Sequence, residues 1–594
     1  MSASGPGAVR MVSAVETSGV PRPRSRRLDL VLIGAAVLLW LGPWLLLTGA
    51  ATVTGGHPTV SPVEFVNPVR IVSTYVADGN RVVLWHLVGA SPPAHPWIFV
   101  AFIVVALVAA AAATGATMIA WAGGIPAVGA TMLLTPPRLQ RSSRWATWRD
   151  LAPLRVRRPR PGSLVLGRRG AHLLATEPET SVLVIGPTRS GKTSGLVVPN
   201  LLEWQGAAIV TSTKSELVDL TSAYRRTQGP VWVYDPTGEA GMLPDRVTWS
   251  PLHGCESLDA AWRVAAWLCA VLQQGGNRSD SDWAHWAESG KLLVAPMLYA
   301  AATGGCTVVD VRDWVAGFDV DTPSALLEAR AGPTSDPQCD ARRALAMLAS
   351  IEQRPEKERG TVFSTVMRIF TVFNERAVAD SALSSEFDAG RLLRERGTLF
   401  LCTPRQTPER VAALFVGILM TVVTRAYALA AAAPRGRLDP GLGLFLDELA
   451  NVVPIEELPS LASQGAGRGV VLMSIVQDLS QLRARYGTDR ANSILNNHGC
   501  KVILSGVTDP ETAETISRLV GRAEYTDVQL SHNQGGTARS YSVRRDPMAS
   551  PDALRQLQEG TAVVLYRGKP PAIVRLRPWY ADRALSARVA GAAA

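Results

Sequence analysis

The residues whose types and spacing most clearly predict chemistry form a glycine-containing loop after a short apolar run. The run is typical of a buried strand and reads Ser181-Val182-Leu183-Val184-Ile185; the loop after it is Gly186-Pro187-Thr188-Arg189-Ser190-Gly191-Lys192-Thr193. Such glycines let backbone N–H groups converge on a polyphosphate, and the next helix adds its positive dipole end. We therefore predict that Lys192 reaches the β- and γ-phosphates of a nucleotide and that the Thr193 hydroxyl binds Mg²⁺. A chance surface turn is the alternative, which the complete spacing disfavours.

Two carboxylates follow another apolar run and could complete a hydrolytic site. Residues 443–446 predict a strand that ends at Asp447 and Glu448. Because ligands of open α/β sheets bind at the carboxyl ends of the strands, both carboxylates are expected at that edge. We predict that Asp447 holds the Mg²⁺ coordination shell and that Glu448 orients or polarises the attacking water. The alternative is a helix N-cap, since Asp and Glu also favour a first helical turn.

Two further polar residues flank the next apolar run, residues 470–476. Gln477 follows the run, and its amide can both donate and accept hydrogen bonds, so it is a candidate γ-phosphate sensor or an ordinary surface glutamine. Arg468 precedes the run between two glycines. It is a candidate arginine finger that reaches the nucleotide of a neighbouring subunit, or an arginine without a phosphate partner.

The chain downstream of the loop alternates short apolar runs with helical stretches, which predicts an α/β fold with a mainly parallel sheet. The predicted strands are 207–210, 231–234, 399–401, 442–446, 470–475, 502–504 and 562–566. Between about 255 and 390 the strand signal nearly disappears, and alanine- and leucine-rich stretches predict a helical insertion. Residues 531–547 are polar and contain glycine, which predicts a loop.

Two apolar segments near the N-terminus are long enough to cross a membrane. The chain is 47% hydrophobic, and the segments cover about 28–50 and 96–122, with a further apolar stretch to 134. At ~1.5 Å per residue each spans a ~30 Å hydrocarbon core. A cleaved signal peptide is the alternative for the first segment, and a buried helix is the alternative for the second.

The arginines predict how these segments are oriented. Ten arginines lie between residues 138 and 170, whereas the loop between the segments carries only Arg70 and Arg81, so both termini are expected in the cytoplasm. The net charge is +10, of which +9 falls in 138–170 and +3 in 1–30, leaving −2 elsewhere. Anionic lipid is the partner that charge alone favours, and nucleic acid is the alternative.

Taken in order, these features resemble the coupling ATPases of type IV secretion and conjugative DNA transfer, the TraG/TraD-like group within the FtsK/HerA-type motors. The resemblance covers most of residues 28 to 580. Besides the two apolar segments it rests on the motifs at 186–193, 446–450, 474–478, 480–482, 509–514 and 563–566.

The resemblance implies a RecA-like P-loop ATPase domain with an inserted all-α domain, preceded by two transmembrane helices in the plasma membrane. It also implies ATP and Mg²⁺ as cofactors and a ring of six subunits. For the sites, it assigns metal and water roles to Asp447 and Glu448 and γ-phosphate sensing to Gln477. It assigns nucleotide binding to Gly186, Pro187, Thr188, Arg189, Ser190, Gly191, Lys192 and Thr193. One departure is Ser212, which stands where relatives often have an acidic residue ahead of the lysine, so residues 212–216 stay unassigned.

The predicted domains follow from these patterns and from the resemblance. They are a disordered basic N-terminus (1–27), a membrane domain with a short extracytoplasmic loop (28–134), a basic linker (135–175), the ATPase domain (176–254 and 391–594) and the all-α insertion (255–390).

The function that the resemblance implies is ATP-driven conjugative DNA transfer. Its partners would be a relaxase bound to DNA, the components of a type IV secretion channel and the membrane. Two alternatives are a secretion ATPase that recruits protein effectors only and an FtsK/HerA-type DNA translocase. The phosphate-binding loop cannot separate these functions.

Overall fold

The computed structural model describes residues 143–591, apart from Met242 and residues 271–279, 334–335, 337, 404–407 and 534–535. The chain divides into two compact units, residues 1–140 and 141–594. The predicted basic N-terminus and both predicted membrane spans therefore lie outside the described residues. All described residues belong to the second unit.

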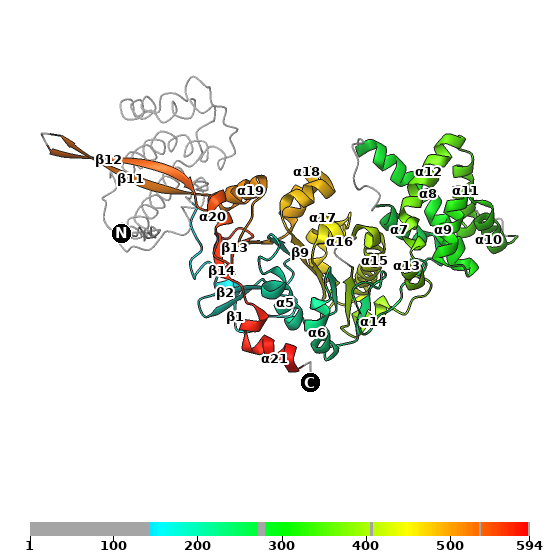
Figure 1. Ribbon diagram of the computed structural model, residues 1–594, viewed down its shortest axis with the longest axis horizontal. Helices are drawn as coiled ribbons and strands as arrows, with labels where there is room; N and C mark the ends of the chain where they lie inside the picture. Colours follow the sequence, from blue (N-terminus) through cyan, green and yellow to red (C-terminus); the bar gives the residue numbers. More distant parts are fainter. Residues whose placement is uncertain are drawn as a thin grey trace, which may run out of the picture. The chain divides into compact units, whose positions relative to one another are not determined.

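A twelve-stranded sheet forms the centre of this unit, in the order β1-β3-β2-β14-β13-β10-β4-β9-β8-β5-β7-β6 (Figure 1). The strands from β10 to β6 in that order run parallel. They are β4 (Val182–Ile185), β5 (Ala208–Ser212), β6 (Val231–Tyr234), β7 (Thr398–Cys402), β8 (Leu442–Leu446), β9 (Val470–Val476) and β10 (Cys500–Leu504). Nearly all of their residues are buried, as expected for parallel strands covered on both faces. The predicted α/β fold is confirmed.

Five strands extend the sheet in antiparallel pairing. They are β1 (Arg155–Val156), β2 (Val165–Arg169), β3 (His172–Ala175), β13 (Thr561–Tyr566) and β14 (Ala572–Arg575). Three of them come from the stretch that the sequence predicted as a basic linker. Each has only one to three consecutive apolar residues, and arginines occupy positions in β1 and β2, so no strand signal stood out.

The side chains of the parallel strands alternate between two hydrophobic clusters, one on each face. On β4, Leu183 and Ile185 enter one cluster and Val182 and Val184 enter the other, as the two-residue period of a strand requires. The second cluster is closed by helices that include α5 (Val198–Glu203), α6 (Glu216–Arg226) and α21 (Arg583–Gly591).

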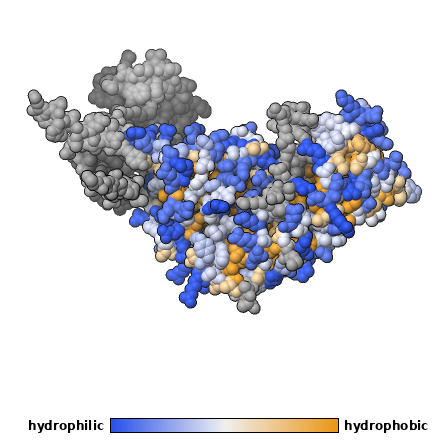
Figure 2. All heavy atoms as spheres, in the orientation of Figure 1, coloured by the Kyte–Doolittle hydropathy of each residue, from blue (hydrophilic) through white to orange (hydrophobic). Residues whose placement is uncertain are grey.

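The first cluster continues into the helices that the chain inserts between β6 and β7, most of which gather at one end of the ribbon in green (Figure 1). These are α7 (Leu258–Ala270), α8 (Asp280–Gly304), α9 (Val308–Gly317), α10 (Asp321–Ala331), α11 (Asp340–Glu352), α12 (Glu356–Phe370), α13 (Arg376–Ser381) and α14 (Ala389–Arg394). The predicted domain boundaries themselves stay a prediction. Figure 2 shows that the visible face of the described part is mostly hydrophilic, with smaller apolar areas.

The remaining helices follow β7. They are α15 (Pro408–Ala432), α16 (Leu449–Val452), α17 (Leu458–Gln464), α18 (Leu479–Asn497), α19 (Pro510–Val520) and α20 (Pro551–Arg555). Within the described residues, α15 is the one helix long and apolar enough to cross a membrane. Because 72% of its apolar window is buried and it packs against α7, it is a core helix here.

The prediction of a loop at 531–547 is wrong. Strands β11 (Arg522–Asn533) and β12 (Gly536–Pro547) pair antiparallel from Arg522 opposite Pro547 to Asn533 opposite Gly536, as a separate two-stranded ribbon (Figure 1). The sequence of this segment is polar at most positions, so it lacks the apolar alternation by which a half-buried strand is predicted.

Candidate nucleotide-binding site

The glycine-containing loop connects β4 to the following helix and closes around its own lysine. The Lys192 ammonium donates hydrogen bonds of 2.7 Å to the carbonyl oxygens of both Gly186 and Pro187. Arg189 and Gly191 have φ values of 65° and 84°, which turn the loop back on itself. A side chain at Gly186 would put its Cβ 2.8 Å from the Cβ of Leu504, so only glycine fits between this loop and β10.

The helix after the loop begins with a wide turn. Residues Thr193–Val197 form a π-helical turn in which Val198 donates its N–H to the Thr193 carbonyl, and α5 follows. Pro199 lies in the first turn of α5 and has no N–H to donate, which is compatible with the change of hydrogen-bond register at this point. Wide turns of this kind occur often at functional sites.

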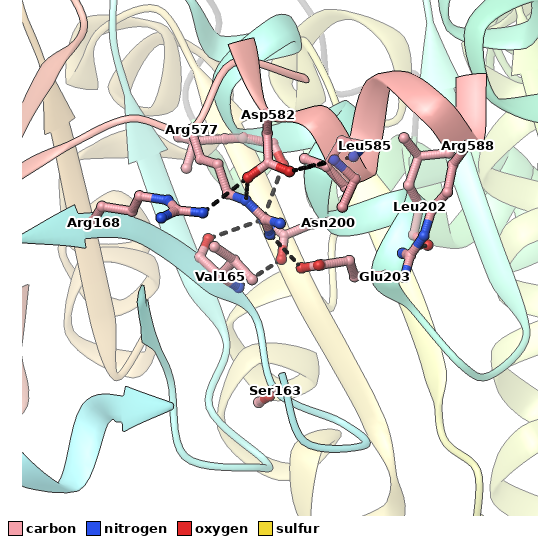
Figure 3. Close-up of polar contacts among 12 residues, drawn as sticks. Ser163, Val165, Arg168, Asn200, Leu202, Glu203, Arg577, Asp582, Leu585 and Arg588 are labelled. Atoms are coloured by element: carbon pink, nitrogen blue, oxygen red, sulfur yellow. Dashed lines mark hydrogen bonds and ion pairs between the residues drawn. The ribbon is translucent and has the colours of Figure 1, made fainter. Parts of the chain in front are cut away.

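A buried asparagine fastens α5 to the sheet. The Asn200 side chain accepts a hydrogen bond of 2.6 Å from the Val165 N–H and donates one of 2.9 Å to the Val165 carbonyl on β2 (Figure 3). It also donates to the Leu196 carbonyl at 2.9 Å. The position of the helix behind the phosphate loop is therefore fixed by hydrogen bonds as well as by packing.

The two predicted carboxylates follow β8, which lies between β5 and β9 in the sheet. The carbonyl of Asp447 accepts a 2.8 Å hydrogen bond from the Thr211 hydroxyl, and its carboxylate accepts one of 3.1 Å from the Glu448 N–H. Glu448 has a φ of 50°, an uncommon backbone conformation for a residue with a side chain. Glu448 occupies the N-cap position of α16, but its side chain makes no capping hydrogen bond to that helix.

Asp447 is an unusual carboxylate because protein surrounds it on most sides. Its pKa is raised to about 6, mainly by burial; the ammonium of Lys192 opposes this rise, and the charge of Glu448 adds to it. The side chain is nevertheless partly accessible from the site. A nearby cation would therefore stabilise the ionised carboxylate.

The loop and the carboxylates meet in one cavity of about 350 Å³. Its lining residues are Thr188, Arg189, Gly191, Lys192, Thr193, Ser194, Ser212, Thr213, Lys214, Glu216, Leu217, Asp447 and Glu448. The structure thus brings together five of the predicted loop residues and both predicted carboxylates. Gly186, Pro187 and Ser190 belong to the same loop without lining the cavity.

Four lining residues come from a segment that the sequence analysis left unassigned, 212–216. Ser212 is the last residue of β5, and its hydroxyl donates to the Lys214 carbonyl at 2.6 Å in a tight turn. Lys214 and Glu216 follow at the start of α6, at the same sheet edge as Asp447. A lysine just beyond a predicted strand was the signal available, but its proximity to the site depends on β5 pairing with β8.

Gln477 and Arg468 lie at opposite ends of β9. Gln477 directly follows the strand, whose last carbonyl, that of Val476, accepts a 3.1 Å hydrogen bond from the Gly186 N–H; it is therefore next to the phosphate loop but does not line the cavity. Arg468 precedes the strand and is exposed, with its guanidinium 4.5 Å from the centre of the Tyr427 ring. The seven residues of β9 lie between them, so their backbones are roughly 20 Å or more apart.

The chain matches the family model described as "Type IV secretory system Conjugative DNA transfer" over residues 138–593. It is 28% identical over 452 residues to a conjugal transfer protein TraG of Escherichia coli, covering 69% of this chain and 68% of that protein. It is 27% identical over 445 residues to the protein VirD4 of Agrobacterium fabrum (strain C58 / ATCC 33970), covering 70% of this chain and 61% of that protein.

Two solved structures of the plasmid coupling protein TrwB share the fold. The complex with the non-hydrolysable ATP analogue ADPNP has a TM-score of 0.53 at 19% identity and covers 75% of this chain and 95% of TrwB. The complex with ADP and Mg²⁺ has a TM-score of 0.53 at 18% identity and covers 74% and 94%. At this identity the likeness establishes the fold.

Proposed function

This chain belongs to the family of type IV secretory system proteins for conjugative DNA transfer, and from that premise we propose that it is an ATP-hydrolysing coupling protein. In this role it would deliver a relaxase bound to DNA to a secretion channel. The observation that carries the proposal is the single cavity in which the phosphate loop meets Asp447 and Glu448. Nucleotide-bound TrwB structures of the same fold support ATP and Mg²⁺ as its ligands.

We assign phosphate binding to the backbone N–H groups of residues 186–193 and to Lys192. Because the Lys192 ammonium now donates to the Gly186 and Pro187 carbonyls, it must exchange these bonds for phosphate oxygens when a nucleotide binds. The guanidinium of Arg189 and the ammonium of Lys214 add positive charge at the cavity wall. These cations favour a polyphosphate over a neutral ligand.

The Thr193 hydroxyl and the Asp447 carboxylate are the residues that would hold Mg²⁺, since both are oxygen donors lining the same cavity. Mg²⁺ supplies charge that neutralises the β- and γ-phosphate oxygens during transfer. We assign Glu448 to the attacking water: it would accept the water's proton and orient its oxygen toward the γ-phosphate. Its left-handed backbone sets the direction of the side chain from β8.

Gln477 is assigned as a γ-phosphate sensor, because it follows the strand beside the phosphate loop. Arg468 is assigned to the nucleotide of a neighbouring subunit, since it precedes β9 and therefore lies at the sheet edge opposite its own cavity. This assignment requires a closed assembly, for which we propose a homo-hexamer. The two predicted spans, 28–50 and 96–122, would anchor the ring in the plasma membrane with both termini in the cytoplasm.

The experiment that tests this function compares DNA and protein cargo. We expect the full chain, purified in detergent, to hydrolyse ATP faster when DNA is added, and we expect salt to suppress the stimulation because phosphate contacts release counterions. Transfer of a relaxase-marked plasmid between cells should require the same protein. A flat response to single- and double-stranded DNA at low salt would favour a protein-effector ATPase, and stimulation without plasmid transfer would favour a DNA translocase of another kind.

A further inference from the structure

A second and larger cavity, of about 830 Å³, lies away from the nucleotide cavity. It is enclosed by β1 to β3, the ends of α5 and α6, and α21. Its lining residues Gln205, Gln228 and Arg396 lie two or three positions before β5, β6 and β7, so the cavity lies at the amino edge of these parallel strands. The nucleotide cavity lies at their carboxyl edge.

Arginines dominate the lining of this space, which we call the arginine cavity. They are Arg157, Arg158, Arg168, Arg396, Arg577 and Arg588, and Glu203 is the single carboxylate among the lining residues. Such an excess of guanidinium groups in one concave space favours an anionic ligand. Some of these arginines already pair with carboxylates of the protein. The others need negative charge from a ligand.

Three of the arginines have partners inside the fold (Figure 3). Arg577 pairs with Glu203 at 2.9 Å and with Asp582 at 2.6 Å, and Arg168 pairs with Asp582 at 2.9 Å. Arg588 donates to the Leu202 carbonyl at 2.8 Å and lies over the ring of Tyr224. These three side chains hold α5 and α21 together and form the inner wall of the cavity.

The other three arginines make no ion pair within the described part of the chain. Arg157 and Arg158 are exposed neighbours just after β1, followed by Pro159, which restricts the backbone of Arg158. Arg396 is exposed, lies in the segment before β7 and has a φ of 56°. Three guanidinium groups therefore border the cavity without a carboxylate to neutralise them.

A fourth positive charge lies behind the wall. Arg225 is fully buried, and its guanidinium donates to the Thr398 hydroxyl at 2.7 Å and to the carbonyls of Trp204 and Gly206. None of these partners is a carboxylate, and burial lowers the pKa of Arg225 to about 10. Because Trp204 lines the arginine cavity, this charge adds to the positive potential there.

We propose that the arginine cavity binds a ligand with two or more phosphate groups, to which Arg157, Arg158 and Arg396 donate hydrogen bonds. The planar guanidinium matches phosphate oxygens in paired hydrogen bonds, whereas a single phosphate would leave part of the charge unmatched. The volume suits a compact ligand enclosed by several elements, which favours a small polyphosphate group over a long nucleic-acid strand. Such a group occurs on soluble polyphosphates and nucleotides and on phospholipid headgroups.

Calorimetric titration of the full chain with inorganic tripolyphosphate tests this proposal. The Lys192→Ala background, reconstituted in neutral phosphatidylcholine nanodiscs, removes the main phosphate contact of the other cavity. We expect tripolyphosphate to bind the Lys192→Ala protein. When Arg157→Ala/Arg158→Ala is added to this background, the affinity should fall at least about tenfold, since hydrogen bonds to charged groups are lost. The matched control is Arg155→Ala/Arg160→Ala: these two exposed arginines flank the pair and do not line the cavity.

The charge-conserving Arg157→Lys/Arg158→Lys variant should bind with intermediate affinity, which guards against loss of binding by misfolding. Absence of tripolyphosphate binding in the Lys192→Ala background, or equal weakening in the control pair, would overturn the proposal. So would an oligonucleotide that binds through Arg157 and Arg158 where tripolyphosphate does not.

A second arm identifies the source of the phosphate groups. In nanodiscs that contain cardiolipin, a lipid headgroup in the cavity should block tripolyphosphate and raise the melting temperature, and both effects should disappear in Arg157→Ala/Arg158→Ala. If the ligand is soluble, tripolyphosphate should bind equally in both kinds of nanodisc. Either result supports a polyphosphate site and assigns its ligand.

Discussion

The Asp447 carboxylate is largely buried, and its ionised form destabilises the folded protein in the absence of a nucleotide. Its pKa of about 6 in the folded chain compares with about 3.9 in an unfolded one. Because this pKa is raised, the contribution of Asp447 to the free energy of unfolding is most favourable below pH ~4 and is lost as the pH rises through about 6. At neutral pH the cost is on the order of 2–3 kcal/mol.

Asp447→Asn should therefore raise the melting temperature of the nucleotide-free protein at pH ~7.5 while removing Mg²⁺-dependent turnover, because the amide needs no counter-charge. Thermal unfolding of the full chain measures the first effect. Asp489→Asn, a change at an exposed helical position, is the control and should leave the melting temperature unchanged. A lower melting temperature for Asp447→Asn would show that the carboxylate stabilises the apo site.

The same pKa sets the pH dependence of Mg²⁺ binding. Because Asp447 must lose its proton to accept Mg²⁺, the Mg²⁺-dependent part of nucleotide affinity should fall as the pH drops below about 6. Titrations of an ATP analogue with and without Mg²⁺, at about pH 5 to 7.5, measure this dependence. Asp447→Asn keeps the titration of the nucleotide itself and is the control. Identical pH profiles for the two proteins would exclude Asp447 from the metal shell.

At the scale of elements, α5 connects the two cavities: the phosphate loop precedes it, and its last residues line the arginine cavity. Asn200 fastens it to Val165 by two hydrogen bonds, and Asn200→Ala would leave that buried backbone pair unsatisfied. We expect a loss of about 2–4 kcal/mol in stability and weaker nucleotide binding. Asn497→Ala, which removes one hydrogen bond to the Pro459 carbonyl, should cost less and leave nucleotide affinity intact.

Denaturation and nucleotide titration of the two variants decide this. Equal effects of Asn200→Ala and Asn497→Ala on nucleotide affinity would mean that the hydrogen bonds to Val165 do not position the loop.

The elements that could be predicted from sequence are those with a local signal. The strand before Gly186 and the strand before Asp447 are apolar runs with motif residues at their ends. Strands β1 to β3 were missed because their apolar runs are at most three residues long, and the β11–β12 hairpin was missed because polar residues occupy most of its positions. Lys214 was left unassigned because its place beside Asp447 depends on sheet order between segments more than 200 residues apart, which no local pattern encodes.

At the scale of the whole molecule, the role proposed for Arg468 requires a ring of subunits and is impossible in a monomer. Since this arginine precedes β9, at the sheet edge opposite its own cavity, we propose that it acts on a neighbour's nucleotide. Arg468→Ala and Lys192→Ala proteins should each be inactive alone. Mixed rings should regain turnover where a cavity with Lys192 lies next to a subunit with Arg468. ATP turnover of the mixture, compared with each protein separately, measures this.

Arg435→Ala, at another exposed arginine, is the control for this experiment and should stay active alone. A mixture no more active than its separate components would remove Arg468 from the mechanism.

The central claim is that the cavity formed by the phosphate loop, Asp447 and Glu448 hydrolyses ATP. The most direct measurement is ATP turnover by the full-length protein beside binding of a non-hydrolysable analogue, for Glu448→Gln and Lys192→Ala. We predict that Glu448→Gln binds the analogue nearly as well as the unchanged protein but loses turnover, whereas Lys192→Ala loses both. Undiminished turnover in either variant would contradict the account.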